Sequence, residues 1–414
     1  MFKYVSIFLF LFPVAIFAQE RYIGNVMADG SAPHYTLVVE KSPKKLYLLK
    51  IDGDNQTLLD NFTVLTGEFD GNKMIEGDKK TPEGIYYITE YMDAPTMRRK
   101  FGSYASTYGT GAYPVNYPNP IDRILKKTGY GIWVHGLDPE RHKPATEGCV
   151  GMQNVDLDQI KPNLSIGMPV VIIDNASFMN KEAYAKQRNA HLDELNKFIE
   201  AWSYGSYDIF SSYVHPKYSS YSGKSAKAYL DKKKQLMGLY PDKQISVDNI
   251  NVYRQNNDTL VYDFDQLYCA PNLVSYGNKR IYLVNDNGTN KVISEEMRSI
   301  PVRSKLDPSI SAFLSSWKLA WESKDIKGYI DFYSPKFANR AAWQEDKEKI
   351  FAAAGKIDVK ISDIKWAQKG GNNFTISFTQ KYSSDKNSDL GIKTLEVEGC
   401  PGAYKIKSER WSRS

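Results

Sequence analysis

The 414-residue sequence predicts a mostly β N-terminal domain followed by two α+β repeats. Short runs rich in β-branched and aromatic residues, separated by Gly and Pro, fill residues 33–175. Beyond residue 178, a stretch without Gly or Pro (179–202) favours a helix, and the remaining chain repeats itself at a nearly constant spacing. A chain of this length exceeds one ordinary hydrophobic core, so we expect two or three domains.

The strands of the N-terminal domain follow from local patterns of apolar residues and turn signals. A Ser-Pro pair at 42–43 separates the first two runs, and an Asp-Gly pair at 52–53 ends the second. The runs expected to form strands are 36–40, 45–50, 62–66, 84–89, 131–135 and 168–173. Residues 156–160 are expected to form a short helix between two of them.

The second part of the chain contains an internal repeat. Trp202, Pro216 and Lys217 recur 119 positions later as Trp321, Pro335 and Lys336. Seven more residues recur 114 positions later: Phe264, Gln266, Tyr268, Gly277, Lys279, Ser294 and Glu295 become Phe378, Gln380, Tyr382, Gly391, Lys393, Ser408 and Glu409. In each copy an amphipathic helix (195–202, 310–317) precedes alternating strands such as 373–379. We therefore expect one repeat over 178–300 and a second over 305–414.

The first residues have the form of a secretory signal peptide. Lys3 is followed by an apolar run over 4–17 and then by Ala18, which predicts cleavage after residue 18 and export to the periplasm or cell envelope. The alternative is an uncleaved anchor, but the run is shorter than the roughly 20 residues that usually span a bilayer. No later segment is long and apolar enough to cross a membrane.

Charge and cysteine content narrow the function classes. The net charge is +6 without a dense Lys/Arg block, which disfavours a nucleic-acid surface and suits an anionic polymer. There are three cysteines, Cys149, Cys269 and Cys400, which is too few to predict a disulfide framework. The sequence shows no His/Cys/Asp cluster at metal-ligand spacing, so we expect neither a metal nor another cofactor.

One of the cysteines stands in a pattern typical of nucleophilic catalysis. The run 131–136 delivers His135 to the end of a predicted strand, and Cys149 follows fourteen residues later behind Gly148. A thiol needs a base to become a nucleophile, and a neighbouring imidazole is expected to lower its pKa and to return the proton to the leaving amine. N–H groups of the Gly148-Cys149 turn are expected to hold an oxyanion. The alternative is a buried structural cysteine beside a surface histidine.

This pattern resembles the L,D-transpeptidase (YkuD) catalytic domain. Its His-Gly and Ser/Thr-x-Gly-Cys motifs stand here as His135-Gly136 and Thr146-Glu-Gly148-Cys149, and residues 67–86 and 116–122 resemble its upstream run. The resemblance implies a YkuD-like β-sandwich with short helices over 33–175. It also implies Cys149 as nucleophile, His135 as general base and acid, and Gly136 as the residue whose carbonyl orients His135. Thr146, Gly148 and Tyr117 (within 116–122) become candidates for substrate or oxyanion contact.

Two departures from the family pattern affect how substrate is held. Glu147 replaces a His found in many members, and Gly151 replaces an Arg. Arg141 and Lys143, in the loop between the histidine and the cysteine, are candidates to replace the missing positive charge. The equally open alternative is that both are solvated loop residues.

The repeats resemble NTF2-like α+β cones, and the combination is similar to L,D-carboxypeptidases that set cell shape. The resemblance implies peptidoglycan stem peptides as substrate and trimming of a tetrapeptide to a tripeptide. Transfer of the acyl group to an amine, giving 3→3 cross-links or an anchored protein, is the alternative outcome. A catalytically silent wall-binding scaffold is an alternative of another class. A papain-like protease would need an Asn or Asp to orient the His and a helix-borne Cys. The repeats could steer the wall polymer, dimerise or bind a wall-associated protein.

Overall fold

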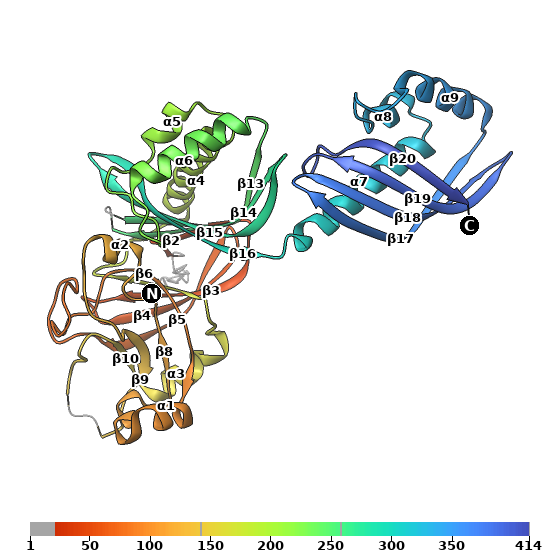
Figure 1. Ribbon diagram of the computed structural model, residues 1–414. Helices are drawn as coiled ribbons and strands as arrows, with labels where there is room; N and C mark the ends of the chain where they lie inside the picture. The colour runs from red at the N-terminus through yellow and green to blue at the C-terminus, as the bar shows by residue number, and fades with distance from the viewer. Residues whose placement is uncertain (1–20, 141–142, 257–258, 414) are drawn as a thin grey trace, which may run out of the picture.

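The computed structural model describes residues 21–140, 143–256 and 259–413 (Figure 1). The predicted signal peptide over 1–18 and the candidate residue Arg141 lie outside these residues. Within the described ranges, no helix has the length and apolar character needed to cross a membrane.

The N-terminal domain is built on one nine-stranded mixed sheet with the order β6-β11-β3-β4-β5-β10-β9-β8-β7. Its strands are β3 (Ser31–Glu40), β4 (Lys45–Gly53), β5 (Asn55–Leu65), β6 (Gly84–Tyr87), β7 (Met92–Asp93), β8 (Gly111–Pro114), β9 (Trp133–Gly136), β10 (Val150–Met152) and β11 (Pro169–Ile173). Only the β3–β11 and β9–β10 pairs of this sheet are parallel. The mostly β fold class is thus confirmed, with all strands joined in one continuous sheet.

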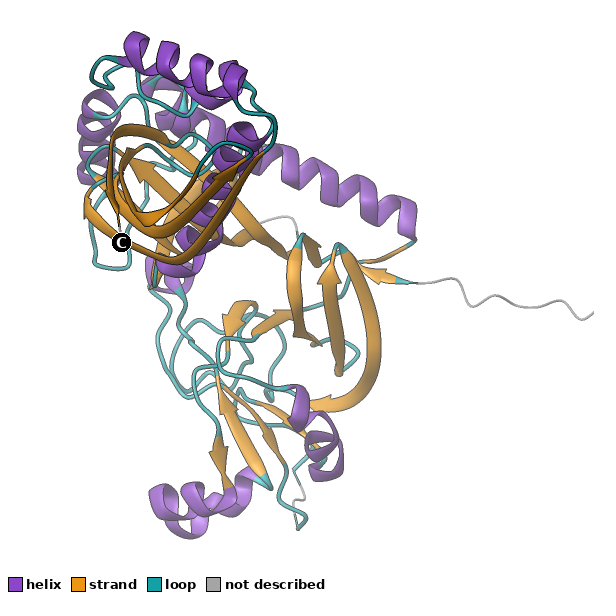
Figure 2. Cartoon of the chain, turned by 90° about the vertical axis from the view of Figure 1, so that its right-hand side faces the viewer, coloured by secondary structure: helices purple, strands orange, loops and turns teal. Residues whose placement is uncertain are grey.

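Short helices complete this domain, and Figure 2 shows several of them at the end remote from the repeats. They are α1 (Ala94–Phe101), the 3-10 helix η1 (Gly102–Tyr108), α2 (Pro120–Ile124), α3 (Asn154–Ile160) and the 3-10 helix η2 (Lys161–Asn163). Asn119 caps α2 in a capping box with Asp122, which explains how a helix of five residues is held in place. The predicted helix over 156–160 is confirmed as the larger part of α3.

The first repeat places three helices against a five-stranded antiparallel sheet. The helices are α4 (Lys181–Ser203), α5 (Tyr207–Ser212) and α6 (Ala226–Leu239). Four strands follow: β13 (Gln244–Gln255), β14 (Thr259–Ala270), β15 (Leu273–Asp286) and β16 (Thr289–Ile300). The fifth strand, β2 (Val26–Asp29), comes from the start of the chain and pairs with β13. Nearby, β1 (Tyr22–Ile23) pairs with β12 (Phe178–Met179).

The sheet of this repeat separates its helices from the N-terminal domain (Figure 1). One face packs on the helices, and the other shares a buried cluster with strands β3, β4, β6 and β11. Within that cluster the guanidinium of Arg280 lies 3.3 Å from the ring centroid of Tyr87 and donates to Asp263 at 2.8 Å. The N-terminal domain and the first repeat therefore share one buried interface.

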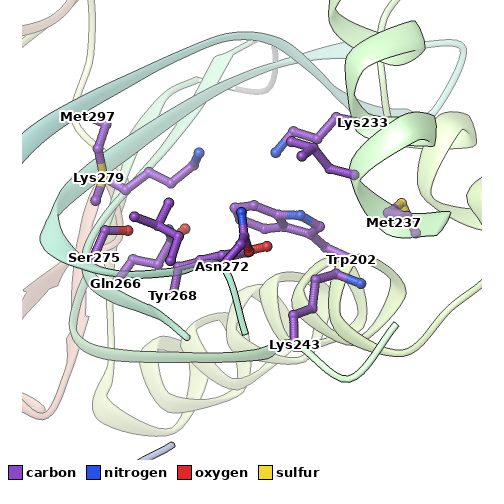
Figure 3. Close-up of a pocket in the computed structure, with 12 residues that line it drawn as sticks. Trp202, Lys233, Met237, Lys243, Gln266, Tyr268, Asn272, Ser275, Lys279 and Met297 are labelled. Carbon is purple, nitrogen blue, oxygen red and sulfur yellow. The ribbon is translucent and has the colours of Figure 1, made fainter. Parts of the chain in front are cut away.

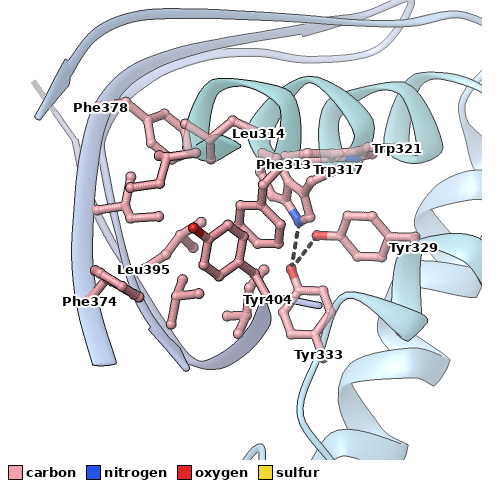
Figure 4. Packing of buried hydrophobic residues seen from close by; sticks show 14 of the residues in the cluster. Phe313, Leu314, Trp317, Trp321, Tyr329, Tyr333, Phe374, Phe378, Leu395 and Tyr404 are labelled. Atoms are coloured by element: carbon pink, nitrogen blue, oxygen red, sulfur yellow. Dashed lines mark hydrogen bonds between the residues drawn. The ribbon is translucent and has the colours of Figure 1, made fainter. Parts of the chain in front are cut away.

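The second repeat has the same order of elements: α7 (Arg303–Glu322), α8 (Ile326–Asp331) and α9 (Arg340–Ala353), then β17 (Ile357–Gly370), β18 (Asn373–Ser384), β19 (Ser388–Glu398) and β20 (Lys405–Arg413). Its core surrounds Trp317, whose indole N–H donates to the hydroxyl of Tyr333 at 3.3 Å (Figure 4). That hydroxyl in turn donates to Glu409 at 2.7 Å.

The sequence repeat is confirmed in three dimensions by equivalent buried ion pairs. Lys279 pairs with Glu295, and Lys393 pairs with Glu409, both at 2.8 Å. All four residues belong to the set that recurs 114 positions apart. The two copies therefore fold alike around the same polar contact.

A disulfide joins Cys269 of the first repeat to Cys400 of the second. Three cysteines were too few for the sequence to predict this bond. The two residues are 131 positions apart and sit in different repeats, so only the packing of one repeat on the other brings them together. Close to this bond, the side chain of Gln244 donates to the carbonyl of Pro401 at 3.3 Å. The free thiol among the described residues is Cys149.

Candidate active site

The pairing of two short parallel strands brings His135 and Cys149 together. His135 lies on β9, and Cys149 directly precedes β10. In the ladder, Val150 is opposite Val134 and Gly151 is opposite His135. The thirteen residues between the histidine and the cysteine therefore connect two adjacent parallel strands in the interior of the sheet.

The thiol of Cys149 is half-buried and rests in its protonated form at neutral pH. Its sulfur donates to the carbonyl of Gly131 at 3.4 Å. Burial raises the pKa of Cys149 to about 11, and the negative charge of Glu147 adds to this against the opposing backbone N–H of Trp133. The expectation of a lowered thiol pKa is therefore wrong, because burial outweighs the stabilising groups. Attack by this sulfur requires a base that removes the proton.

His135 is oriented by its own strand end. The side chain is 3% exposed, and its Nδ1 lies 2.5 Å from the carbonyl oxygen of Gly136. A carbonyl can only accept, so Nδ1 carries the proton and Nε2 is left as the basic nitrogen. The ring of Tyr108 stands edge-on to the imidazole, with centroids 5.2 Å apart.

Thr146 holds the turn that carries the nucleophile. Its hydroxyl donates to the carbonyl of Cys149 at 2.6 Å and accepts the N–H of Gly148 at 3.2 Å. Its own N–H donates to the carbonyl of Thr66 at 2.8 Å. The expected oxyanion role of the Gly148 amide is not supported, since that N–H is already engaged. Thr146 and Gly148 shape the turn, and Gly148 adopts φ +131°, which favours glycine.

A buried ion pair beneath the site was not predicted. Lys73 donates to Asp78 at 2.8 Å, and Asp78 also accepts backbone N–H groups from Met74, Ile75 and Lys80. Burial opposes the charge of Asp78, but these donors hold its pKa well below the usual range. The positive charge of Lys73 acts on Cys149 and partly offsets the rise of its pKa. The available signal was the Gly-Asn-Lys and Gly-Asp motifs within residues 67–86.

The remaining candidates lie elsewhere. Tyr117 is 6% exposed, donates to the carbonyl of Thr128 at 3.1 Å and packs against Tyr86. It is therefore a core residue, and the expected substrate contact is not supported. Lys143 is exposed on the loop before the nucleophile. No group of three or more His, Cys, Asp or Glu side chains within the described ranges could hold a metal ion.

A separate cavity of about 240 Å³ lies in the first repeat. Lys233 and Lys279 point toward the ring of Trp202, with Nζ atoms 3.7 and 4.9 Å from its centroid (Figure 3). Burial and the neighbouring Lys279 and Lys243 lower the pKa of Lys233 to about 7, against the opposing charge of Glu295. The lining contains no cysteine or histidine, so this cavity is distinct from the Cys149 site.

The nine-stranded mixed sheet, with a His-Gly segment on one strand and a Gly-Cys segment before its parallel neighbour, is the arrangement expected for a YkuD-like domain, and comparison with known proteins agrees. Residues 34–172 match the model of the L,D-transpeptidase catalytic domain (YkuD), and residues 190–296 and 309–410 match the Cds6 C-terminal NTF2-like domain. The chain therefore carries an L,D-transpeptidase (YkuD) catalytic domain followed by two regions of the Cds6 C-terminal NTF2-like family. No curated protein matches the chain.

Two solved structures share the fold over about two thirds of this chain. Bd1075 of Bdellovibrio bacteriovorus is 24% identical with a TM-score of 0.60, covering 68% of this chain and 99% of its own. The helical cell shape determining protein Pgp2 of Campylobacter jejuni is 21% identical with a TM-score of 0.54, covering 66% of this chain and 95% of its own. At these identities the likeness establishes the fold.

Proposed function

We propose that this protein is a cysteine-dependent L,D-carboxypeptidase that trims the tetrapeptide stem of peptidoglycan to a tripeptide. The observation that carries the proposal is the geometry of one base and one protonated thiol. The Gly136 carbonyl fixes the tautomer of His135, and Cys149 precedes the neighbouring parallel strand with a pKa of about 11. A thiol that cannot ionise alone and a histidine prepared to accept a proton are complementary.

In the first step, Nε2 of His135 takes the proton of Cys149 while the sulfur attacks the carbonyl carbon at the L-centre of diaminopimelate. The C–N bond to the terminal D-Ala then breaks, and His135 returns the proton to the leaving amine. The product is a thioester between Cys149 and the shortened stem. In the second step, His135 deprotonates a water molecule that attacks the thioester, the C–S bond breaks, and the thiol regains its proton.

The choice of water as acceptor rests on domain arrangement. This chain has a YkuD domain followed by NTF2-like domains, and it shares its fold with a helical cell shape determining protein. Shape control by shortening stems needs hydrolysis and no second stem. An amine acceptor would give a 3→3 cross-link from the same thioester, and a protein amine would give an anchored protein.

The location of this activity is proposed to be the periplasm or cell envelope. A domain that acts on the cell wall and a disulfide between the repeats both suggest a site outside the cytoplasm. The NTF2-like repeats are proposed to contact the wall polymer or a wall-associated protein.

The test is mass spectrometry of purified tetrapeptide muropeptides incubated with the protein beside a Cys149→Ala variant. We expect tripeptide and free D-Ala only with the intact thiol. Cross-linked dimers in place of tripeptide would make the protein a transpeptidase. If neither product forms and no acyl adduct appears on Cys149, a silent wall-binding scaffold replaces the proposal.

A further inference from the structure

The first residue of α3, Asn154, directs its side chain toward the segment that holds the base. Its Nδ2 donates to the carbonyl of Leu137 at 2.9 Å, and its Oδ1 accepts the N–H of Thr110 at 3.1 Å. The helix cap is provided by the backbone of Gln153, with no side-chain cap hydrogen bond. The amide of Asn154 therefore serves two distant segments and not its own helix.

Two glycines make room for this amide. A Cβ on Gly136 would lie 2.2 Å from Oδ1 of Asn154, and a Cβ on Gly109 would lie 2.0 Å from the same atom. Gly109 also adopts φ +58°, a conformation that favours glycine. Both backbones approach the amide so closely that any side chain at these positions would displace it.

The segment held in this way is the one that orients His135. Nδ1 of the imidazole contacts the Gly136 carbonyl, and Asn154 binds the next carbonyl along the chain, that of Leu137. Peptide groups are planar, so only the two backbone torsions of Leu137 separate the two carbonyls. Glycine has the greatest backbone freedom of any residue, so the end of β9 at Gly136 needs contacts from other elements to keep one conformation.

The second hydrogen bond of Asn154 holds a segment next to a ring that packs on the imidazole. Thr110 follows η1, which ends at Tyr108, whose ring stands edge-on to His135. One amide thus ties the carbonyl of Leu137, next in the chain to the carbonyl that selects the tautomer, to the segment whose aromatic ring packs edge-on against the imidazole.

We propose that Asn154 is a positioning residue of the acyl transfer, which rests on the proposed function of Cys149 and His135. It fixes the Gly136 carbonyl so that Nδ1 of His135 keeps its proton and Nε2 remains the base. Without it, the carbonyl rotates away, and the histidine no longer presents one nitrogen reliably to the thiol.

Two substitutions separate this role from a contribution to helix stability. Asn154→Ala removes both hydrogen bonds. Asn154→Asp keeps an acceptor for Thr110 but loses the donor to Leu137, and a carboxylate in the first turn of a helix is favourable for the helix itself. Gln153→Ala is the matched control, because it changes the adjacent residue, whose side chain makes no cap hydrogen bond.

The measurement is the rate constant for alkylation of Cys149 by iodoacetamide between pH 5 and 10, beside thermal unfolding of each full-length variant. For both Asn154 variants we expect the alkylation rate constant at pH 7 to fall about tenfold to 100-fold, because displacing a catalytic group commonly lowers a rate by this factor. Their pH profiles should move toward that of His135→Ala. Asn154→Asp and Gln153→Ala should unfold near the wild-type midpoint, and Gln153→Ala should keep the wild-type profile.

The outcomes separate a failure of the proposed Cys149–His135 pair from a failure of the positioning role of Asn154. If wild type and His135→Ala react identically at every pH, the proposed catalytic pair fails. If the wild-type rate depends on His135 but both Asn154 variants retain the wild-type profile, the positioning role is overturned. It is also overturned if the losses follow the unfolding midpoint alone, or if Gln153→Ala shows the same loss.

Discussion

The raised pKa of Cys149 leads to a quantitative prediction for the variant His135→Ala. With a pKa of about 11, only about one thiol in 10,000 is ionised at pH 7 without help from a base. At the unperturbed value of 9.0, about one in 100 would be ionised. The variant should therefore be alkylated about 100-fold more slowly at pH 7 than the same thiol in the unfolded chain.

The raised pKa of Cys149 also determines how the alkylation rate changes with pH. Burial favours the neutral thiol in the folded protein, so the thiolate appears only as the pH rises toward about 11. In His135→Ala the rate constant should increase about tenfold for each pH unit up to that value. In wild type the imidazole accepts the proton, and general base assistance of this kind is worth about 100-fold or more. Wild type should therefore exceed the variant most strongly near neutral pH and converge with it at high pH.

The assay is iodoacetamide alkylation followed by intact-protein mass spectrometry, with His215→Ala as the matched control. His215 lies in the first repeat, and its Nδ1 accepts the N–H of Lys217. It is therefore remote from the Cys149 site in the N-terminal domain. The control should follow the wild-type profile. Equal rates for wild type and His135→Ala at pH 7 would contradict the role of His135 as base, and a thiol that titrates near 9 in the variant would contradict the effect of burial on its pKa.

Three further outcomes follow from the structure. Replacing Cys269 and Cys400 together by Ala should lower the free energy of unfolding in urea by up to about 5 kcal/mol, the chain-entropy value for a loop closed over 131 residues, while alkylation of Cys149 stays unchanged. Glu147→Gln removes a charge that raises the thiol pKa, so the alkylation rate at pH 7 should rise about two- to threefold. The effect is small because the carboxylate is exposed, and Glu140→Gln, in the preceding loop, is the matched control. Trp317→Ala should cost about 3 to 5 kcal/mol in urea unfolding, because the side chain is fully buried and its N–H donates to Tyr333; no change in midpoint would contradict the packing.

The fold class was predictable because its signals are local. Alternating apolar residues identified the long strands, and recurring Trp, Lys and Glu positions identified the two copies of the repeat. Some short strands, such as β8 and β10, were missed because a run of three or four residues carries no periodicity of its own. The pairing of β2 with β13 joins residues more than 200 positions apart, and nothing in either segment specifies the other.

The sequence singled out a histidine and a cysteine that the structure places on and directly before neighbouring strands, but it did not predict their electrostatics. The motifs identified Cys149 and His135, yet the sign of the thiol pKa shift depends on burial, which a motif does not encode. The same holds for Thr146, which binds the nucleophile's own backbone, and for Asn154, whose partners come from two separate segments. Each of these roles is a property of packing between elements.

The raised pKa of the thiol also suits the chemistry of the rest of the chain. The Cys269–Cys400 bond is of a kind that forms and persists in oxidising surroundings, in which thiolates are the species that react with oxidants and disulfides. Because burial and Glu147 keep Cys149 protonated, this thiol reacts slowly on its own. Its nucleophilicity then arises only at the site where His135 can take the proton. Under the proposed function, the burial that makes the reaction depend on a positioned histidine would also protect Cys149 from oxidants in the surroundings that favour the Cys269–Cys400 bond.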